Sequence, residues 1–116
     1  MPNIPVLSQL ENYLAVTNRR ETVIASNMAN VDTPGYRTKD IDFQQELARA
    51  MAAPQGSSAS VAVRDVKGLL ERPDGNNVDI DKQSLELGEA QLQYQMGTQL
   101  MKDRFHQILT AINGDQ

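Results

Sequence analysis

Apolar residues recur at helical spacing near both ends of the chain and lose this order in between. Close to the N-terminus, steps of three and four residues define a stripe in which six of eight positions are apolar. This spacing predicts a long amphipathic helix over about residues 5–31, which begins either at Pro5 or, with Ser8 as its cap, three residues later. Glu21 interrupts the stripe and either faces solvent or pairs with a basic residue in an assembly. The eight positions are Leu7, Leu10, Leu14, Thr17, Glu21, Ile24, Met28 and Val31.

A second long helix is predicted over about residues 79–113. Asp79 or Asp81 suits the positive end of a helix dipole, and the pair Asn113-Gly114 supplies a stop. Gly88 and Gly97 weaken this helix in isolation but allow another helix to approach closely. The apolar stripe shifts in phase near Leu100, between Leu85, Leu92, Met96 and Leu100 on one side and Met101, Phe105, Ile108 and Ile112 on the other.

The middle of the chain has weaker signals. Residues 32–51 are expected to form a turn and a short helix, which Asp42 caps and in which Phe43 and Leu47 recur at a four-residue step. Residues 52–77 begin as a flexible linker rich in Ala, Ser and Gly. From Val61 onward a weak alternation indicates a short strand or an extended arm, and a turn cluster follows at residues 72–77.

These patterns predict one mainly α domain of 116 residues. Its two long terminal helices should pack as a coiled-coil-like hairpin, with an irregular, partly flexible middle segment. The chain has two Phe, three Tyr and no Trp, so a large core of its own is not expected. Two amphipathic helices alone bury little surface, and we therefore expect neighbouring copies to cover the stripes.

Composition excludes several classes of function. A net charge of −4 argues against sequence-independent nucleic-acid binding, which requires a basic surface. The absence of cysteine excludes disulfides and thiolate metal sites. No run approaches the roughly 18 apolar residues of a membrane span, and the N-terminus lacks the pattern of a cleaved signal peptide.

No reactive constellation is visible, so we expect no enzymatic activity, no catalytic residue, no cofactor and no metal ion. His106 is the only histidine and is expected to be a packing or surface residue. Asp74, Asp79 and Asp81 lack the ligand spacing of an EF-hand, and turn and cap duties explain them better. Arg19, Arg20, Arg37 and Lys39 are expected to be solvated or to form salt bridges between subunits.

The segment at residues 25–37 joins a helix end to a fixed turn. Pro34 pushes Thr33 out of the helical region, so the helix should stop near Asn30 or Val31. Thr33 to Tyr36 read as a type II turn, in which Pro34 presets φ at the second position and Gly35 accepts a positive φ at the third.

This segment resembles the N-terminal signature of bacterial flagellar axial proteins, Ala-Asn-x-x-Thr-Pro-Gly-Tyr-Lys/Arg. The matching positions are Ala29, Asn30, Thr33, Pro34, Gly35, Tyr36 and Arg37. Residues 72–82 resemble a second string, which is typical of FlgB-type proximal rod proteins within the same rod and hook family. The positions that carry it are Asp74, Gly75, Asn76, Val78 and Asp79. The stretch Gly88 to Gln91 departs from the Asn-rich pattern expected there.

The resemblance implies a structural subunit of the flagellar basal-body rod that self-assembles near its proximal end and transmits torque for swimming. It implies export through the flagellar type III apparatus without signal cleavage, and a place in the periplasmic rod. Implied partners are other copies, neighbouring rod subunits and the rod adaptor at the membrane ring. The alternatives are another rod or hook-base subunit, or a cytoplasmic helical adaptor or export chaperone.

Two sets of residues are assigned to these roles. Phe43 and Leu47 fit the Phe-x-x-x-apolar spacing of segments that dock at the export gate, although a core-facing helical pair has the same spacing. The stripes provide the assembly surface. The residues assigned to it are Leu7, Leu10, Leu14, Ile24, Met28, Leu92, Met96, Phe105, Ile108 and Ile112.

Overall fold

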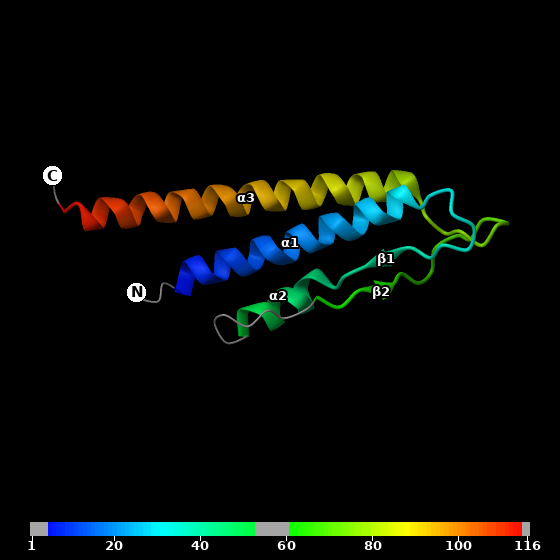
Figure 1. Cartoon of the computed structure of the whole chain (residues 1–116), viewed down its shortest axis with the longest axis horizontal. Helices are drawn as coiled ribbons and strands as arrows, with labels where there is room; N and C mark the ends of the chain where they lie inside the picture. Colours follow the sequence, from blue (N-terminus) through cyan, green and yellow to red (C-terminus); the bar gives the residue numbers. More distant parts are fainter. Residues whose placement is uncertain (1–4, 53–60, 115–116) are drawn as a thin grey trace.

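The computed structural model describes residues 5–52 and 61–114 and is elongated, with extents of 67 × 26 × 18 Å. Two long antiparallel helices, α1 and α3, lie side by side (Figure 1). On the other side of α1 lie a short helix, α2, and a two-stranded antiparallel ribbon in which Lys39 pairs with Asp65. The elements in chain order are α1 (Pro5–Ala29), β1 (Lys39–Asp40), α2 (Phe43–Ala52), β2 (Arg64–Asp65) and α3 (Ile80–Ile112). The mainly helical hairpin with an irregular middle is confirmed, and most of the expected flexible linker, at residues 53–60, lies outside the described residues.

The helix boundaries follow from local signals. The helix α1 begins at Pro5, so the alternative start capped by Ser8 is wrong. It ends at Ala29, two residues earlier than predicted. There the Asn30 side chain donates to the Ser26 carbonyl, and the Val31 amide bonds to the carbonyl three residues back, at Met28, instead of four. Asp42 caps α2 by accepting from the Gln45 amide at 3.1 Å. Asp79 caps α3 through the amides of Asp81 and Lys82, at 3.1 and 3.3 Å.

The apolar core lies between α1 and the α2–ribbon unit. Val16, Val23 and Ile41 form its buried centre, and Phe43 is among the half-buried residues that pack against it. The Phe43 ring meets Tyr13 edge to face, with centroids 5.8 Å apart. Burial raises the pKa of the Tyr13 phenol. The expected short helix is therefore the part of the chain that closes the core.

The contact between α1 and α3 has a different character. The residues of α3 that are buried in it are Gln83, Ala90 and Gly97, spaced seven apart. Opposite them, Arg20 is 9% exposed and bonds to Glu89 and Gln93, both at 3.3 Å. Polar and small side chains, rather than the apolar stripe of α3, thus form its seam with α1.

Gly97 confirms the expectation that a glycine lets the two helices come close. A Cβ atom there would lie 2.8 Å from the Leu14 Cδ2 and from the Tyr13 ring. At Gly88 nothing in the chain lies within 4 Å of an added Cβ atom, so α1 makes no close approach there.

This contrast predicts opposite effects of one substitution. Gly97→Leu should lower the free energy of unfolding by about 1–3 kcal/mol, because the added side chain overlaps α1. Gly88→Leu, the matched control, should leave stability unchanged or raise it by about 0.5–1 kcal/mol through better helix propensity. Urea unfolding followed by circular dichroism measures both. Equal stabilities of the two variants would contradict the close approach at Gly97.

Candidate functional site

The two segments that carry the sequence motifs contact each other at one end of the molecule, away from both chain termini (Figure 1). We call this structure, residues 29–38 with residues 71–79, the clasp. The Gly35 amide donates to the Asp74 carbonyl at 2.9 Å, and the Asn77 amide donates to the Tyr36 carbonyl at 3.3 Å. Motifs about forty residues apart in sequence therefore form one structural unit.

The first half of the clasp is the predicted type II turn. Gly35 has φ +75°, and the Tyr36 amide donates to the Thr33 carbonyl at 3.2 Å. Gly75 in the second half has φ +87°, and a Cβ atom on it would lie 3.3 Å from the Gly35 Cα. A side chain at Gly75 would thus be strained by its backbone and crowded by the turn. The two motif glycines allow the two backbones to touch.

Asn76 links the halves through its side chain. It is fully buried, and its Nδ2 donates to the carbonyls of Asn30 at 2.9 Å and Thr33 at 2.8 Å. Its Oδ1 accepts from the Val78 amide at 2.7 Å. Each of these carbonyls also accepts one backbone amide, that of Thr33 or of Tyr36, so Asn76 adds a second donor to each just beyond the end of α1. The amide of Asn76 therefore takes part in fixing both the turn and the approach to α3.

Asn27, inside the last turns of α1, joins the clasp to the rest of the fold. It is fully buried, and its Nδ2 donates to the Lys39 carbonyl at 2.7 Å and to Gln83 Oε1 at 2.8 Å. Its Oδ1 accepts from the Tyr36 hydroxyl and from the Lys39 amide, each at 3.0 Å. Two donors and two acceptor positions are all in use, which is the full capacity of an amide. The motif tyrosine is thereby tied to α1, and α1 to β1 and α3.

Sequence reasoning did not single out Asn27 or Gln83. The available signal was a polar residue, Asn27, beside the stripe position Met28 near the end of an amphipathic helix. Its partner Gln83 is 56 positions away, and no local pattern identifies it. Sequence reasoning also missed the role of Arg72, whose guanidinium donates to the carbonyls of Val78 and Val31 and so links the two halves of the clasp.

The basic residues pair mostly within the chain, which corrects the expectation that they are solvated or bridge subunits. Arg37 bonds to the Gly75 carbonyl and pairs with Glu71 at 3.4 Å. Lys39 pairs with Asp65 across the ribbon, and Arg20 pairs with Glu89. The exposed pairs contribute about 0–1 kcal/mol each and refine the clasp rather than hold it.

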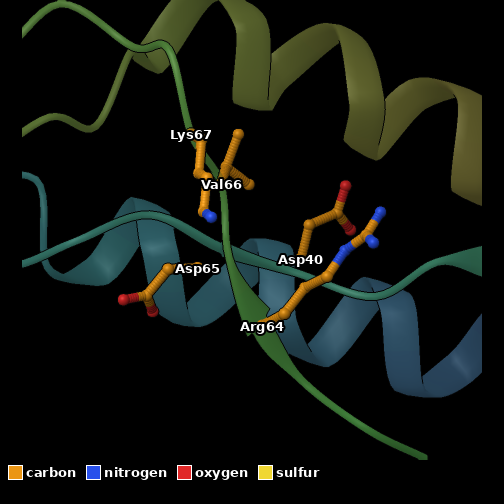
Figure 2. Close-up of a pocket in the computed structure, with 5 residues that line it drawn as sticks. All are labelled: Asp40, Arg64, Asp65, Val66 and Lys67. Atoms are coloured by element: carbon orange, nitrogen blue, oxygen red, sulfur yellow. The ribbon is translucent and has the colours of Figure 1, made fainter.

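Charged groups surround a cavity of about 690 Å³ at the ribbon. Asp40 and Arg64, which are partners across the ribbon, line it together with Asp65, Val66 and Lys67 (Figure 2), and the Arg64 guanidinium pairs with Asp42 at 3.8 Å. Burial, and then the charge of Asp40, raise the pKa of the Glu86 carboxyl on α3. Among the described residues no cluster of three His, Asp or Glu side chains could hold a metal ion. Asp74 and Asp79 instead accept bonds from nearby backbone amides.

The residues assigned to assembly differ in exposure. Ile24 is fully buried inside the chain, while Leu7, Leu10, Leu14, Met28 and Ile108 are half-buried. Leu92, Met96, Phe105 and Ile112 are more than half exposed, and His106 is also exposed. Phe43 and Leu47 are half-buried. None of the helices, within the residues that the structure describes, is long and apolar enough to span a bilayer.

Asn27 provides a direct test of the clasp. Asn27→Ala should lower the free energy of unfolding by about 2–4 kcal/mol, because buried groups on the turn, β1 and α3 lose their partner. Asn18→Ala, an exposed asparagine on the same helix, is the control and should change it by less than about 0.5 kcal/mol. Urea unfolding measures both. A loss at Asn27 no greater than at Asn18 would show that the buried amide does not hold the fold together.

Sequence comparisons relate the chain to known proteins. The model of the family described as flagella basal body rod protein matches residues 14–37, which include the turn motif. Flagellar basal body rod protein FlgB of Bacillus subtilis is 30% identical over an alignment 120 positions long, which covers 93% of each chain. FlgB of Aeromonas hydrophila is 32% identical over 89% of each chain. FlgB of Cereibacter sphaeroides is 33% identical over 88% of this chain and 89% of its own. The chain belongs to the FlgB family of flagellar basal-body rod proteins.

Proposed function

We propose that this structural rod subunit lies near the proximal end of the rod, assembles through the outer faces of its terminal helices, and has no enzymatic activity. The observation that carries the proposal is the row of large apolar side chains exposed on α3. Such a row is costly in water and typical of a surface that a partner covers. Its members are Leu85, Leu92, Met96 and Leu100, followed by Phe105, Leu109 and Ile112.

The clasp contributes by fixing the relative position of α1 and α3. A fully satisfied buried polar network has one low-energy arrangement, so it makes the joint stiff. A subunit that passes torque to its neighbours requires such stiffness, because a loose hairpin would absorb the rotation. We assign this role to Asn27, Asn76 and the two motif glycines, Gly35 and Gly75.

Location and partners rest on the family relationship. We propose export through the flagellar type III apparatus without signal cleavage, followed by incorporation into the periplasmic part of the basal body. The partners would be other copies of the chain, the neighbouring rod subunits and the adaptor at the membrane ring.

The segment proposed to dock at the export gate is packed in the folded chain. Phe43 contacts Tyr13 of α1, and the Glu46 carboxylate accepts from the Ala62 amide at 3.3 Å. Docking of Phe43 and Leu47 at a gate would therefore require α2 to leave α1. The segment could act in export only before the chain folds.

This proposal predicts that Phe43→Ala reduces the amount of the chain secreted into the medium several-fold, with little change inside the cell. Ile41→Ala is the matched control, because it also removes a core side chain but lies outside the docking segment. Both should destabilise the fold by about 2–4 kcal/mol. Equal secretion of the two variants, measured by immunoblot, would contradict a docking role for Phe43.

The proposed function is tested by electron microscopy of basal bodies from cells that lack this chain. We expect membrane rings without a rod and non-motile cells, both restored by the intact chain. A restoring copy with Leu92→Asp should fail, whereas Gln91→Asp, its exposed neighbour, should restore the rod. Complete rods in swimming cells without the chain would contradict the proposal.

A further inference from the structure

The side chain of Glu86 lies where α3, α1 and β1 meet. Gln83, one turn before it on α3, bonds to Asn27 of α1, and Asn27 bonds in turn to Lys39 of β1. The Gln83 Nε2 also donates to the Glu86 carboxylate, at 3.5 Å. The Glu86 side chain is half-buried there. A carboxyl group is thus attached directly to the buried amide network that aligns α3 on α1.

The cations around Glu86 do not neutralise it. Arg20 of α1 is buried, but its guanidinium pairs with Glu89, at 3.3 Å. Lys82, one turn away on α3, is exposed, so its charge is screened by water and salt. Among the residues that the structure describes, no lysine or arginine forms an ion pair with Glu86. The Gln83 amide is therefore its main source of stabilisation as an anion.

The ribbon does not supply a cation either. Its charged side chains pair with others of the same part of the chain, Lys39 with Asp65 and Arg64 with Asp42. Lys67 is exposed and lines the cavity at the ribbon.

Like charges act on Glu86 from two elements, Asp40 on β1 and Glu89 on α3. Figure 2 shows the Asp40 side chain extending from β1 toward α3. Burial first, and then the charge of Asp40, raise the pKa of the Glu86 carboxyl, whereas the charges of Lys82 and Arg20 oppose this rise. The ionised form of Glu86 is thus the form that the fold disfavours.

We infer that Glu86 makes the joint between α3, α1 and β1 sensitive to pH, because uptake of a proton by its carboxyl removes the repulsion from Asp40 and tightens the joint. The bond from Gln83 survives this change, since a protonated carboxyl keeps an oxygen that accepts. The inference goes beyond the proposed function and does not depend on it, because it concerns the folded single chain.

The direction of the effect follows from linkage between proton binding and folding. Glu86 binds its proton more tightly in the folded chain than in the unfolded chain, where its pKa is the ordinary 4.5. The stabilisation is therefore complete below this ordinary value and is lost as the pH rises through the raised pKa of Glu86. Each pH unit between the two pKa values corresponds to about a tenfold change in the folding equilibrium constant.

Urea unfolding of the purified chain between about pH 4 and about pH 8 tests this dependence. Glu86→Gln resembles the protonated form at every pH. It should unfold at a higher urea concentration than the intact chain at neutral pH, and the two midpoints should converge as the pH falls toward 4.5. Glu11→Gln, which changes an exposed glutamate on α1, is the matched control and should follow the intact chain throughout. A difference between Glu86→Gln and the intact chain that does not shrink with falling pH, or no difference at any pH, would overturn the inference.

The titration of Glu86 itself separates repulsion from burial. Its midpoint, followed by carbon NMR of the side-chain carboxyl and assigned by the loss of the signal in Glu86→Gln, should lie above 4.5. Asp40→Asn should lower the midpoint, because asparagine keeps the oxygen that accepts from the Ile41 amide but carries no charge. Lys82→Gln should raise it, because an opposing positive charge is removed. A midpoint at or below 4.5, or shifts in the same direction in the two variants, would overturn the inference.

The Lys39 amide reports on the joint, because it donates to Asn27 Oδ1 at 3.0 Å. Its protection against hydrogen exchange is measured relative to the rate of an unfolded chain at the same pH. In the intact chain this protection should rise as the pH falls, and in Glu86→Gln it should be high at every pH. Equal protection in the two chains across the range would place the effect of the proton outside the joint and overturn the inference.

Discussion

The hydrogen bonds of one buried amide connect the parts of this molecule that would otherwise be separate. Asn27 bonds to the turn through Tyr36, to the ribbon through Lys39 and to α3 through Gln83. Each bond adds only about 1 kcal/mol net, but each partner is buried or half-buried and would cost about 1–3 kcal/mol if left unpaired. The arrangement in which all four bonds form at once is therefore strongly preferred over those in which some are missing. This preference sets how far α3 slides along α1, and with it the position of every exposed side chain on α3.

A polar joint also explains where the apolar residues go. The core of the chain is on the α2 side of α1, around Val16, Val23 and Ile41. The α3 side of α1 meets Gln83, Ala90 and Gly97, so the buried part of the seam takes none of the exposed Leu and Met side chains of α3. Buried polar contacts such as Asn27 with Gln83 are weak sources of stability but good determinants of register. The hairpin is thus aligned by polar contacts, and most of the large apolar surface of α3 is left for other subunits.

The elements that could be predicted are those with local causes. The caps at Asp42 and Asp79, the stop at Gly114 and the turn around Gly35 each depend on residues within a few positions, and the structure has all of them. The contact between the motifs could not be predicted, because the bonds of Asn76 to Asn30 and Thr33 span more than forty residues. Nor does the stripe on α1 say which neighbour covers it. Ile24, assigned to assembly from its spacing, is fully buried inside the chain. The pairing of Arg20 with Glu89 and of Arg37 with Glu71 could not be predicted either, because these partners are distant in the sequence.

The phase shift near Leu100 gains a physical meaning from the lengths of the helices. A helix that packed only on α1 would keep its apolar residues on one face and end where α1 ends. Instead, α3 changes its apolar face and extends by eight more residues than α1 has, about 12 Å. Leu85 and Leu92 lie on the side of α3 away from α1, whereas Met96 and Leu100 line a groove with Leu10 and Tyr13 of α1. Beyond Leu100, the side chains of Phe105, Leu109 and Ile112 are more than half exposed on another side of the helix. Both departures from a simple hairpin leave apolar surface that the single chain does not cover. The length of α3 and the position of its phase shift thus determine together how much apolar surface the subunit exposes, and on which sides of the helix.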